Sequence, residues 1–335
     1  MSSHKNTENR HLENCAKLLK NAPPYVKQYV RSIHYSTAPR TQEAYVRDIM
    51  AFFSYIGDRI DVSNIKNLER ITKEDFEEYF EYLERYEKDG REITNGRESI
   101  KRKISALRNF FAYLFESGQI PSDEIRKLRI PKPAKKNIIR MDNDEAHDFI
   151  NEVTFGNGLT QHESAYHQKY AIRDITMLRL MISTGIRVSE CAELDVKDVD
   201  MKNCSIHIIR KGGNEATIYF PDDLADQMKE YLEYRKNISG AADTETALFL
   251  SNRKQRIAVR TIEHLVKKYA SRSVPSKHIT PHKLRSTYAT ELYKATGDIY
   301  LVAEALGHND VTTTKNHYAE ISDEHKRQNR NKVSF

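Results

Sequence analysis

The sequence has few cysteines and no long apolar run. Cys15, Cys191 and Cys204 are its three cysteines, and they have no paired spacing. Their odd number favours free thiols in a reducing compartment over disulfides or a zinc site. The N-terminus lacks the apolar stretch of a secretory signal, and no segment approaches the roughly 18 apolar residues of a membrane span. We therefore expect a cytoplasmic protein that does not enter a membrane.

Charged residues are abundant and unevenly distributed. They make up 30% of the 335 residues, against 39% hydrophobic residues, and the net charge is +6. Residues 71–90 carry eight acids and three bases, whereas residues 97–140 carry twelve lysines and arginines and four acids. This contrast favours a surface that faces a polyanion and a solvated opposite side. The alternative is a helical protein with ordinary charged surfaces. The length suggests two domains of roughly 150 residues each.

The first domain is predicted to be helical. Residues 1–21 are polar, and we expect them to form a flexible lead-in. Apolar residues then recur at helical spacing and predict four helices within residues 22–128. These helices are expected at residues 24–33, at 39–56, from the capping-box pattern of Thr72 and Asp75 through Leu83, and at 98–116. We interpret their apolar stripes as the core of a small helical domain.

Basic residues of this domain are candidate phosphate contacts. Lys101, Arg102 and Lys103 lie at the N-terminal end of the last predicted helix, where positive side chains and free backbone N–H groups suit a phosphate. A solvated basic face is the alternative for any one of them. The full set of candidate contacts is Arg40, Thr41, Tyr45, Arg47, Lys101, Arg102, Lys103, Lys132, Lys135 and Lys136.

A basic linker is predicted at residues 129–140. Residues 130–140 read IPKPAKKNIIR, which contains two prolines and three lysines and has no periodicity. The second domain, residues 141–320, then begins with the capping-box residues Asp142 and Glu145. Residues 321–335 form a C-terminal tail.

The second domain is predicted to be mostly helical with one β-hairpin. Glycines indicate a loop at residues 155–168, and residues 205–209 and 216–220 flank the turn KGGN of the hairpin. The expected helices cover residues 171–183, 222–236, 259–272, 281–295, 298–306 and 312–318.

Four short stretches of this domain concentrate cations and hydrogen-bond donors. They are TGIRVSE with Arg187 and Glu190, RKGGN with Lys211, HKLR with His282 and Arg285, and LGHNDVTTTKNHY with His308 and Tyr318. Taken one at a time, each of these is a weak signal.

In this order and spacing, the four stretches resemble those of the tyrosine recombinases, also called the phage integrase family. The stretches RTQEAYVRDIMAFFSYI and SIKRKISALRNFFAYLFESGQI are similar to the helical core-binding domain of that family. The resemblance covers roughly residues 22–320. It implies a mainly α fold with a small β-hairpin or sheet. The expected architecture is a two-domain DNA clamp, with a SAM-like core-binding domain and a mixed α/β catalytic domain.

The resemblance also implies a role for each residue of the site. Metal-free cleavage of a phosphodiester requires cations beside the nonbridging oxygens, and Arg187 and Arg285 suit this because a guanidinium stays charged and donates in pairs. Tyr318 is expected to be the nucleophile. Because a free tyrosine has a pKa of about 10, it requires a neighbouring base.

The remaining site residues assist this attack. His282 is the candidate base, and Lys211 on the hairpin turn is similar in position to the family's general acid, which protonates the leaving 5′ oxygen. His308 would donate a hydrogen bond to the phosphate. Glu190 would hold the cationic residues in their orientation. Neither a cofactor nor a metal is expected.

The implied reaction joins DNA to the protein through a 3′-phosphotyrosyl link, and a second round of exchange resolves a Holliday junction. The expected partners are double-stranded DNA with paired recombination sites, three further copies of the chain in a homo-tetramer, and accessory directionality or host DNA-bending proteins. The tail at residues 321–335 either docks onto a neighbouring subunit in trans or is a frayed, charged end. The expected location is the nucleoid in a bacterial cytoplasm.

Some residues depart from the family pattern. Glu215 stands near a place where relatives often have a second basic residue, and Ser286 follows Arg285 where many have a histidine. His317 is a further donor to which no role is assigned. A zinc site formed by His282, His308 and His317 would lack the thiolate or closely spaced histidine pair that zinc sites use.

Three classes of function remain open: a site-specific recombinase, a type IB topoisomerase and a non-catalytic DNA-binding protein. The favoured one is an active recombinase of a mobile element, because the predicted loop at residues 155–168 is longer than a minimal catalytic domain needs. A Xer-type enzyme that resolves chromosome or plasmid dimers is the alternative within the family. A type IB topoisomerase shares the chemistry but would need no defined site. A non-catalytic DNA-binding protein on the same fold would be expected to have lost one of the six catalytic residues.

Overall fold

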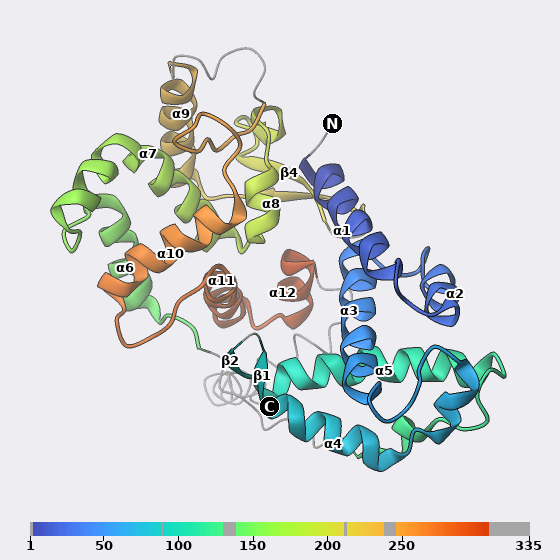
Figure 1. Ribbon diagram of the computed structural model, residues 1–335. Coiled ribbons are helices and arrows are strands. Elements are labelled where there is room, and N and C mark those ends of the chain that lie inside the picture. The colour runs from blue at the N-terminus through green and yellow to red at the C-terminus, as the bar shows by residue number, and fades with distance from the viewer. Residues whose placement is uncertain (1–2, 89, 130–138, 211–212, 238–245, 308–335) are drawn as a thin grey trace, which may run out of the picture. The chain divides into compact units, whose positions relative to one another are not determined.

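The computed structural model describes residues 3–88, 90–129, 139–210, 213–237 and 246–307 (Figure 1). The chain divides into two compact units, Met1–Lys135 and Lys136–Phe335. Each unit encloses a hydrophobic core of its own. The division falls within residues 129–140, which were predicted to form a linker. Residues 130–138 of that segment lie outside the described part of the chain.

The first unit is a helical bundle with one small hairpin. The hairpin strands pair antiparallel, with Arg85 opposite Thr94. Its elements are α1 (Ser3–Leu19), α2 (Pro24–Ser32), α3 (Pro39–Ile56), η1 (Ile65–Arg70), α4 (Lys73–Glu84), β1 (Arg85–Lys88), β2 (Arg91–Thr94), α5 (Arg97–Glu116) and η2 (Glu124–Lys127). The four predicted helices correspond to α2, α3, α4 and α5, and the capping box of Thr72 and Asp75 starts α4.

The prediction of a flexible lead-in at residues 1–21 was wrong. Helix α1 occupies Ser3–Leu19 and packs along α3. His11 Nδ1 lies 2.5 Å from Glu43 Oε2, and Cys15 is buried in the core of the unit. Only a few apolar residues mark the buried side of this polar helix, so its stability comes from packing against α3 and not from a pronounced apolar stripe.

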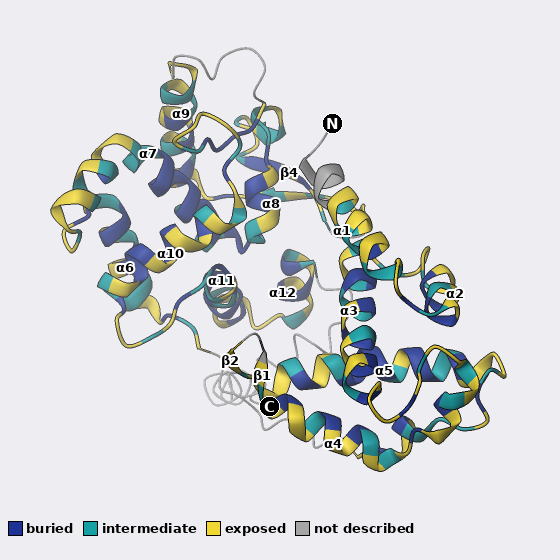
Figure 2. Ribbon diagram, viewed as in Figure 1, coloured by how far each residue is buried: buried dark blue, intermediate teal, exposed yellow. Residues whose placement is uncertain are grey.

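Aromatic rings fill the core of the first unit. Phe52 stacks on Phe76 with ring centroids 4.9 Å apart, and Tyr29 meets Phe110 edge-on at 5.2 Å. Such pairs stabilise a core beyond the area they bury. Helices α3 and α5 pack against each other, and Figure 2 shows buried residues alternating with exposed ones along both helices. The apolar stripes that were interpreted as core therefore form the hydrophobic core of the first unit.

The second unit is also mainly helical and holds a three-stranded antiparallel sheet in the order β3-β4-β5. Its elements are α6 (Asn143–Phe155), α7 (Gln161–Thr184), α8 (Val188–Glu193), η3 (Val196–Asp198), β3 (Val199–Asp200), β4 (Ser205–Ile209), β5 (Glu215–Tyr219), α9 (Asp222–Lys236), α10 (Val259–Ser273), α11 (Pro281–Thr296) and α12 (Ile299–Leu306). The predicted hairpin is confirmed as β4 and β5, with Ile206 opposite Ile218. The helix expected at residues 312–318 lies outside the described residues.

The loop predicted at residues 155–168 is much shorter in the structure. Gly156 ends α6 in the left-handed region at φ 64°, and α7 already begins at Gln161. Thr160 and Glu163 form a capping box at this start. The sequence pattern misled because glycines dominate the short connection and obscure the capping box that follows it.

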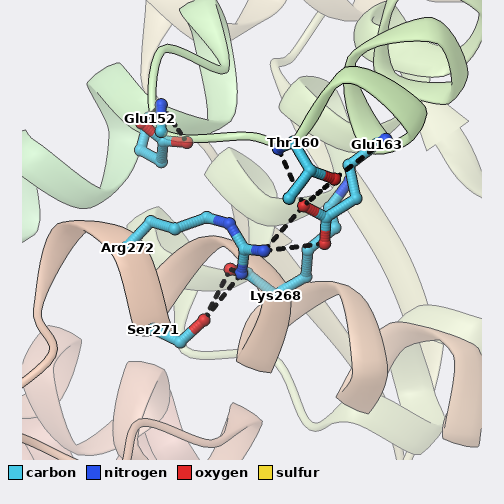
Figure 3. A network of polar contacts seen from close by, with 7 residues as sticks. Glu152, Thr160, Glu163, Lys268, Ser271 and Arg272 are labelled. Carbon is cyan, nitrogen blue, oxygen red and sulfur yellow. Dashed lines mark hydrogen bonds and ion pairs between the residues drawn. The ribbon is translucent and has the colours of Figure 1, made fainter.

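Polar contacts fasten the start of α7 to α10 (Figure 3). Arg272 Nη2 donates to both carboxylate oxygens of Glu163, at 2.8 and 2.6 Å. The backbone N–H of Thr160 donates to the same carboxylate at 3.0 Å. The Thr160 backbone hydrogen bond, together with Arg272, lowers the pKa of Glu163. The connection between α6 and α7 is held by charged hydrogen bonds and not by burial alone.

Candidate active site

Arg187 lies at the start of α8 and is held by Glu190. Gly185 ends α7 in the left-handed region at φ 64°, and Arg187 occupies the N-cap position of α8. Its backbone N–H donates to Glu190 Oε2 at 2.9 Å, and its Nη1 donates to Oε1 at 2.7 Å. The Glu190 side chain is only 6% exposed. This geometry agrees with the expectation that Glu190 orients a cationic residue.

Tyr288 of α11 fixes the turn that precedes Arg187. A Cβ atom on Gly185 would lie 2.4 Å from Tyr288 Cδ1, so the ring packs directly on the glycine backbone. Burial raises the pKa of Tyr288. Glycine is required here both by the backbone conformation and by the close approach of the ring.

Arg285 and His282 lie one turn apart on α11. Pro281 occupies the first turn of this helix, where its missing N–H costs nothing. Arg285 is buried, and its Nη1 donates to the Gly185 carbonyl at 2.6 Å. His282 is exposed and precedes Arg285 by three residues, which places both on one side of the helix.

Both predicted arginines contact the C-terminal end of α12. Arg285 Nη2 donates to the carbonyl of Leu306, and Arg187 Nη2 donates to the carbonyl of Gly307 at 3.3 Å. The last carbonyls of a helix have no partner within the helix and carry a partial negative charge. Two guanidinium groups therefore meet at successive carbonyls, and His308 is the next residue in the chain.

Arg210 joins the same helix end, and it was not among the predicted site residues. It follows β4, and its Nη1 and Nη2 donate to the carbonyls of Glu304 and Ala305 at 3.1 and 3.0 Å. Burial lowers the pKa of Arg210, and the positive charge of Arg187 lowers it further. The only sequence signal is its place directly before Lys211, because a contact across more than 90 residues leaves no local pattern.

Three of the six predicted catalytic residues lie outside the described part of the chain. They are Lys211, His308 and Tyr318. Residues 213–215 resume the hairpin after Lys211, and Gly307 immediately precedes His308. Within the described ranges, no group of three or more histidine, cysteine or acidic side chains is arranged to hold a metal ion. His308 and His317 of the considered zinc site are not described.

Several candidate phosphate contacts of the first unit are paired with buried acids. Arg102 and Lys103 of α5 both contact Asp48 of α3, whose side chain is 1% exposed. Arg47 pairs with Glu43, one turn earlier on α3. The sequence pattern did not predict these pairs, which position the basic side chains while compensating part of their charge.

The other candidate contacts differ in exposure. Arg40 and Lys101 are exposed, whereas Thr41 and Tyr45 are half-buried. Lys132, Lys135 and Lys136 lie outside the described residues.

Across the described residues, none of the helices combines the length and the apolar character needed to span a membrane.

The second unit matches a family model described as the phage integrase family, over residues 157–325. Residues 26–118 match the SAM-like N-terminal domain of phage integrases. Tyrosine recombinase XerC of Vibrio vulnificus strain YJ016 is 30% identical over 218 residues, which are 65% of this chain and 64% of that protein. XerC of Vibrio cholerae strain O395 is 29% identical over 217 residues, and the match spans 65% of its length.

Solved structures with the same fold are more distant in sequence. XerH recombinase bound to palindromic difH substrate in a post-cleavage complex has a TM-score of 0.69 and 18% identity, covering 96% of this chain and 88% of that chain. The Tn1549 transposon integrase (residues 82–397) in complex with circular intermediate DNA has a TM-score of 0.67 and 17% identity, covering 91% and 99%. These likenesses confirm the predicted two-domain fold.

The ranges of the two family models include the residues described above. The integrase model spans half of the chain and includes Arg187, Arg210 and Arg285, and the SAM-like model includes the paired basic residues of α3 and α5. The chain therefore belongs to the phage integrase family, the tyrosine recombinases.

Proposed function

We propose that this protein is a site-specific DNA recombinase that cleaves and rejoins DNA strands through a 3′-phosphotyrosyl intermediate on Tyr318. The observation that carries the proposal is the convergence of Arg187 and Arg285 on the end of α12. Each arginine is oriented by a buried or backbone acceptor, so neither has to reorganise when a phosphate arrives. Preorganised donors of this kind contribute strongly to the stabilisation of a charged transition state.

The chemistry assigns a task to each group. Tyr318 attacks the phosphorus, and His282 accepts its proton. The bond from phosphorus to the 5′ oxygen breaks, and Lys211 gives that oxygen a proton. His308 donates a hydrogen bond to the phosphate. Arg187 and Arg285 neutralise the nonbridging oxygens, and Glu190 holds Arg187 in place.

The proposed partners follow from the same chemistry. The substrate is double-stranded DNA with paired recombination sites, and the active assembly is a homo-tetramer that passes through a Holliday junction. Residues 321–335 would dock in trans onto a neighbouring subunit. Accessory directionality or DNA-bending proteins would act at the sites, in the nucleoid of a bacterial cytoplasm. Solved relatives described as bound to DNA support the choice of substrate.

Two biological roles fit this activity. The sequence favoured a mobile-element integrase because of a long loop at residues 155–168, but that argument is lost because α7 begins at Gln161. The Tn1549 transposon integrase still supports a mobile-element role by fold. Resolution of chromosome or plasmid dimers is the second candidate, and the similarity to XerC proteins favours it.

A capture experiment on unselected DNA tests the proposal and identifies the recombination site at the same time. Wild-type protein is incubated with a library of nicked duplexes of random central sequence, and DNA that becomes covalently attached is recovered and sequenced. The nick lets the cleaved end diffuse away, so the covalent complex accumulates. We expect enrichment of one inverted-repeat sequence with the wild type and no recovery with Tyr318→Phe.

The alternatives give different outcomes in the same assay. Recovery of DNA without a common sequence would favour a type IB topoisomerase. DNA that is enriched by binding but never attached covalently would favour a non-catalytic DNA-binding protein. Comparison of the enriched sequence with chromosomal sites and with the ends of mobile elements separates the two biological roles.

A further inference from the structure

Arg210 connects two segments that lead to different proposed catalytic residues. It directly precedes Lys211 in the chain, and its side chain reaches the end of α12, which directly precedes His308. The two terminal nitrogens of its guanidinium donate to the carbonyls of Glu304 and Ala305, so both are engaged by α12. A planar guanidinium presents two separate nitrogens to two neighbouring acceptors in a fixed geometry, whereas an ammonium group donates from a single nitrogen.

The backbone of Arg210 is fixed as well as its side chain. Its N–H donates to the Asn214 carbonyl at 2.8 Å, and its carbonyl accepts from the N–H of Gly213 at 3.0 Å. These two bonds close the connection between β4 and β5, and Lys211 follows Arg210 within that connection in the sequence. Arg210 is therefore anchored in the turn at one end and on α12 at the other.

Gly307 makes the close approach possible. Its φ is 60°, and a Cβ atom at this position would lie 1.8 Å from Arg210 Nη1 and 2.4 Å from Cζ. The guanidinium thus lies against the glycine backbone, and a side chain there would displace it. This contact is independent of the two hydrogen bonds and joins the same two segments.

We propose that Arg210 is a positioning residue that ties the Lys211 turn to the C-terminal end of α12 and so sets where Lys211 delivers its proton. The inference rests on the proposed function. In the cleavage step, Tyr318 loses its proton to His282 and bonds to phosphorus, while the leaving 5′ oxygen takes a proton from Lys211. Arg210 acts through Lys211, because both of its terminal nitrogens are engaged by carbonyls of α12.

A substrate whose leaving group needs no proton tests this role. Replacing the bridging 5′ oxygen by sulfur gives a thiolate leaving group, which departs without a general acid because thiols are far more acidic than alcohols. On ordinary DNA of the captured sequence, we expect Arg210→Ala to cleave about 10- to 100-fold more slowly than the wild type. On the sulfur-containing DNA, the two proteins should cleave at similar rates.

Three further variants sharpen the test. Lys211→Ala should show the same dependence on the leaving group, and the double variant should be no slower than Lys211→Ala alone. Arg210→Lys keeps the charge but lacks the fixed two-nitrogen geometry of the guanidinium, so it should recover part of the lost rate. Equal slowing of Arg210→Ala on both substrates would contradict the proposal, as would an unchanged rate on ordinary DNA. Failure of the wild type on both substrates would instead overturn the proposed function.

Amide hydrogen exchange tests the connection in the absence of DNA. In Arg210→Ala we expect faster exchange at Gly213 in the turn and at Gly307 at the end of α12, with an unchanged unfolding midpoint for the domain. Arg179→Ala is the matched control, because the partners of the Arg179 guanidinium are Asp223 and Gln227 of α9 and not the carbonyls of α12. Unchanged exchange at both glycines in Arg210→Ala would show that Arg210 does not link the two segments.

Discussion

Arg187 and Glu190 contact each other through both the backbone and the side chain. The backbone N–H of Arg187 donates to one carboxylate oxygen at 2.9 Å, and its guanidinium donates to the other at 2.7 Å. The Glu190 carboxylate therefore caps the start of α8 and also orients the Arg187 side chain toward the end of α12. The cap of α8 and the orientation of the Arg187 guanidinium depend on the same three-residue spacing.

Loss of this carboxylate should reduce catalysis more than DNA binding. In Glu190→Ala, Arg187 keeps its charge but loses the acceptor that orients it, and a displacement of about 1 Å can cost about 100-fold in rate. We expect cleavage to fall about 10- to 100-fold in single-turnover capture, with affinity for DNA within about threefold of the wild type. Glu193→Ala, an exposed acid of the same helix, is the control. A full cleavage rate in Glu190→Ala would contradict this role.

Two glycines with the same backbone conformation should differ in their tolerance of alanine. Gly185 has φ 64° and touches the Tyr288 ring, whereas Gly118 has φ 68° and nothing within 4 Å of a Cβ atom. Gly118→Ala should lower the free energy of unfolding by about 1 kcal/mol through backbone strain alone. Gly185→Ala adds the cost of overpacking, about 1–3 kcal/mol. Urea unfolding measures both, and equal losses would show that the Tyr288 contact is unimportant.

The capping box of α7 predicts a specific dependence of stability on pH. The Thr160 backbone N–H and Arg272 lower the folded-state pKa of Glu163 below its ordinary value of 4.5. The unfolded state therefore binds more protons between these two values. The stabilisation is fully present above about pH 4.5 and is lost as the pH falls through the lowered pKa.

Glu163→Gln should remove this contribution. We expect the difference in unfolding free energy between the wild type and Glu163→Gln to be constant near neutral pH and to shrink as the pH falls below 4.5. Urea titrations at several pH values between neutrality and strong acid measure it. A difference that persists unchanged in acid would mean that the Glu163 carboxylate does not stabilise the fold through its charge.

The exposed basic residues of the first unit should contribute to DNA binding in a salt-dependent manner. Arg40 and Lys101 are exposed, and each phosphate contact contributes roughly 0.9 to the slope of log affinity against log salt. Arg40→Ala and Lys101→Ala should each weaken binding and reduce this slope by about 1. Arg85→Ala, an exposed cation paired with Glu92 in the β1–β2 hairpin, is the control. A slope unchanged in all three variants would place the phosphate contacts elsewhere.

Local patterns predicted the helices whose burial is one-sided. The stripes that contain Phe52 of α3, Phe76 of α4 and Phe110 of α5 are apolar enough to show their periodicity. The capping residues Thr72 and Asp142 mark the starts of α4 and α6. The hairpin of β4 and β5 was predicted because the residues that flank its turn are rich in β-branched side chains. In these segments, local preference and tertiary packing agree.

Sequence patterns did not predict the features that depend on contacts between residues far apart in the chain. Helix α1 is polar, and its contact with α3 through His11 and Glu43 joins residues 32 positions apart. The β1–β2 hairpin lies in an acidic stretch, where charges conceal the alternation of a strand. Arg210 is the clearest case, because its acceptors on α12 are backbone carbonyls, which any residue type provides.

The most direct test of the account is the identity of the residue that becomes attached to DNA. Wild-type protein trapped on the captured nicked sequence is digested, and mass spectrometry locates the modified peptide and the end of the DNA to which it is linked. We predict a 3′-phosphate ester on Tyr318, absent from Tyr318→Phe and retained in Tyr300→Phe, whose tyrosine is exposed on α12. Attachment through another residue, or through a 5′-phosphate, would contradict the proposed mechanism.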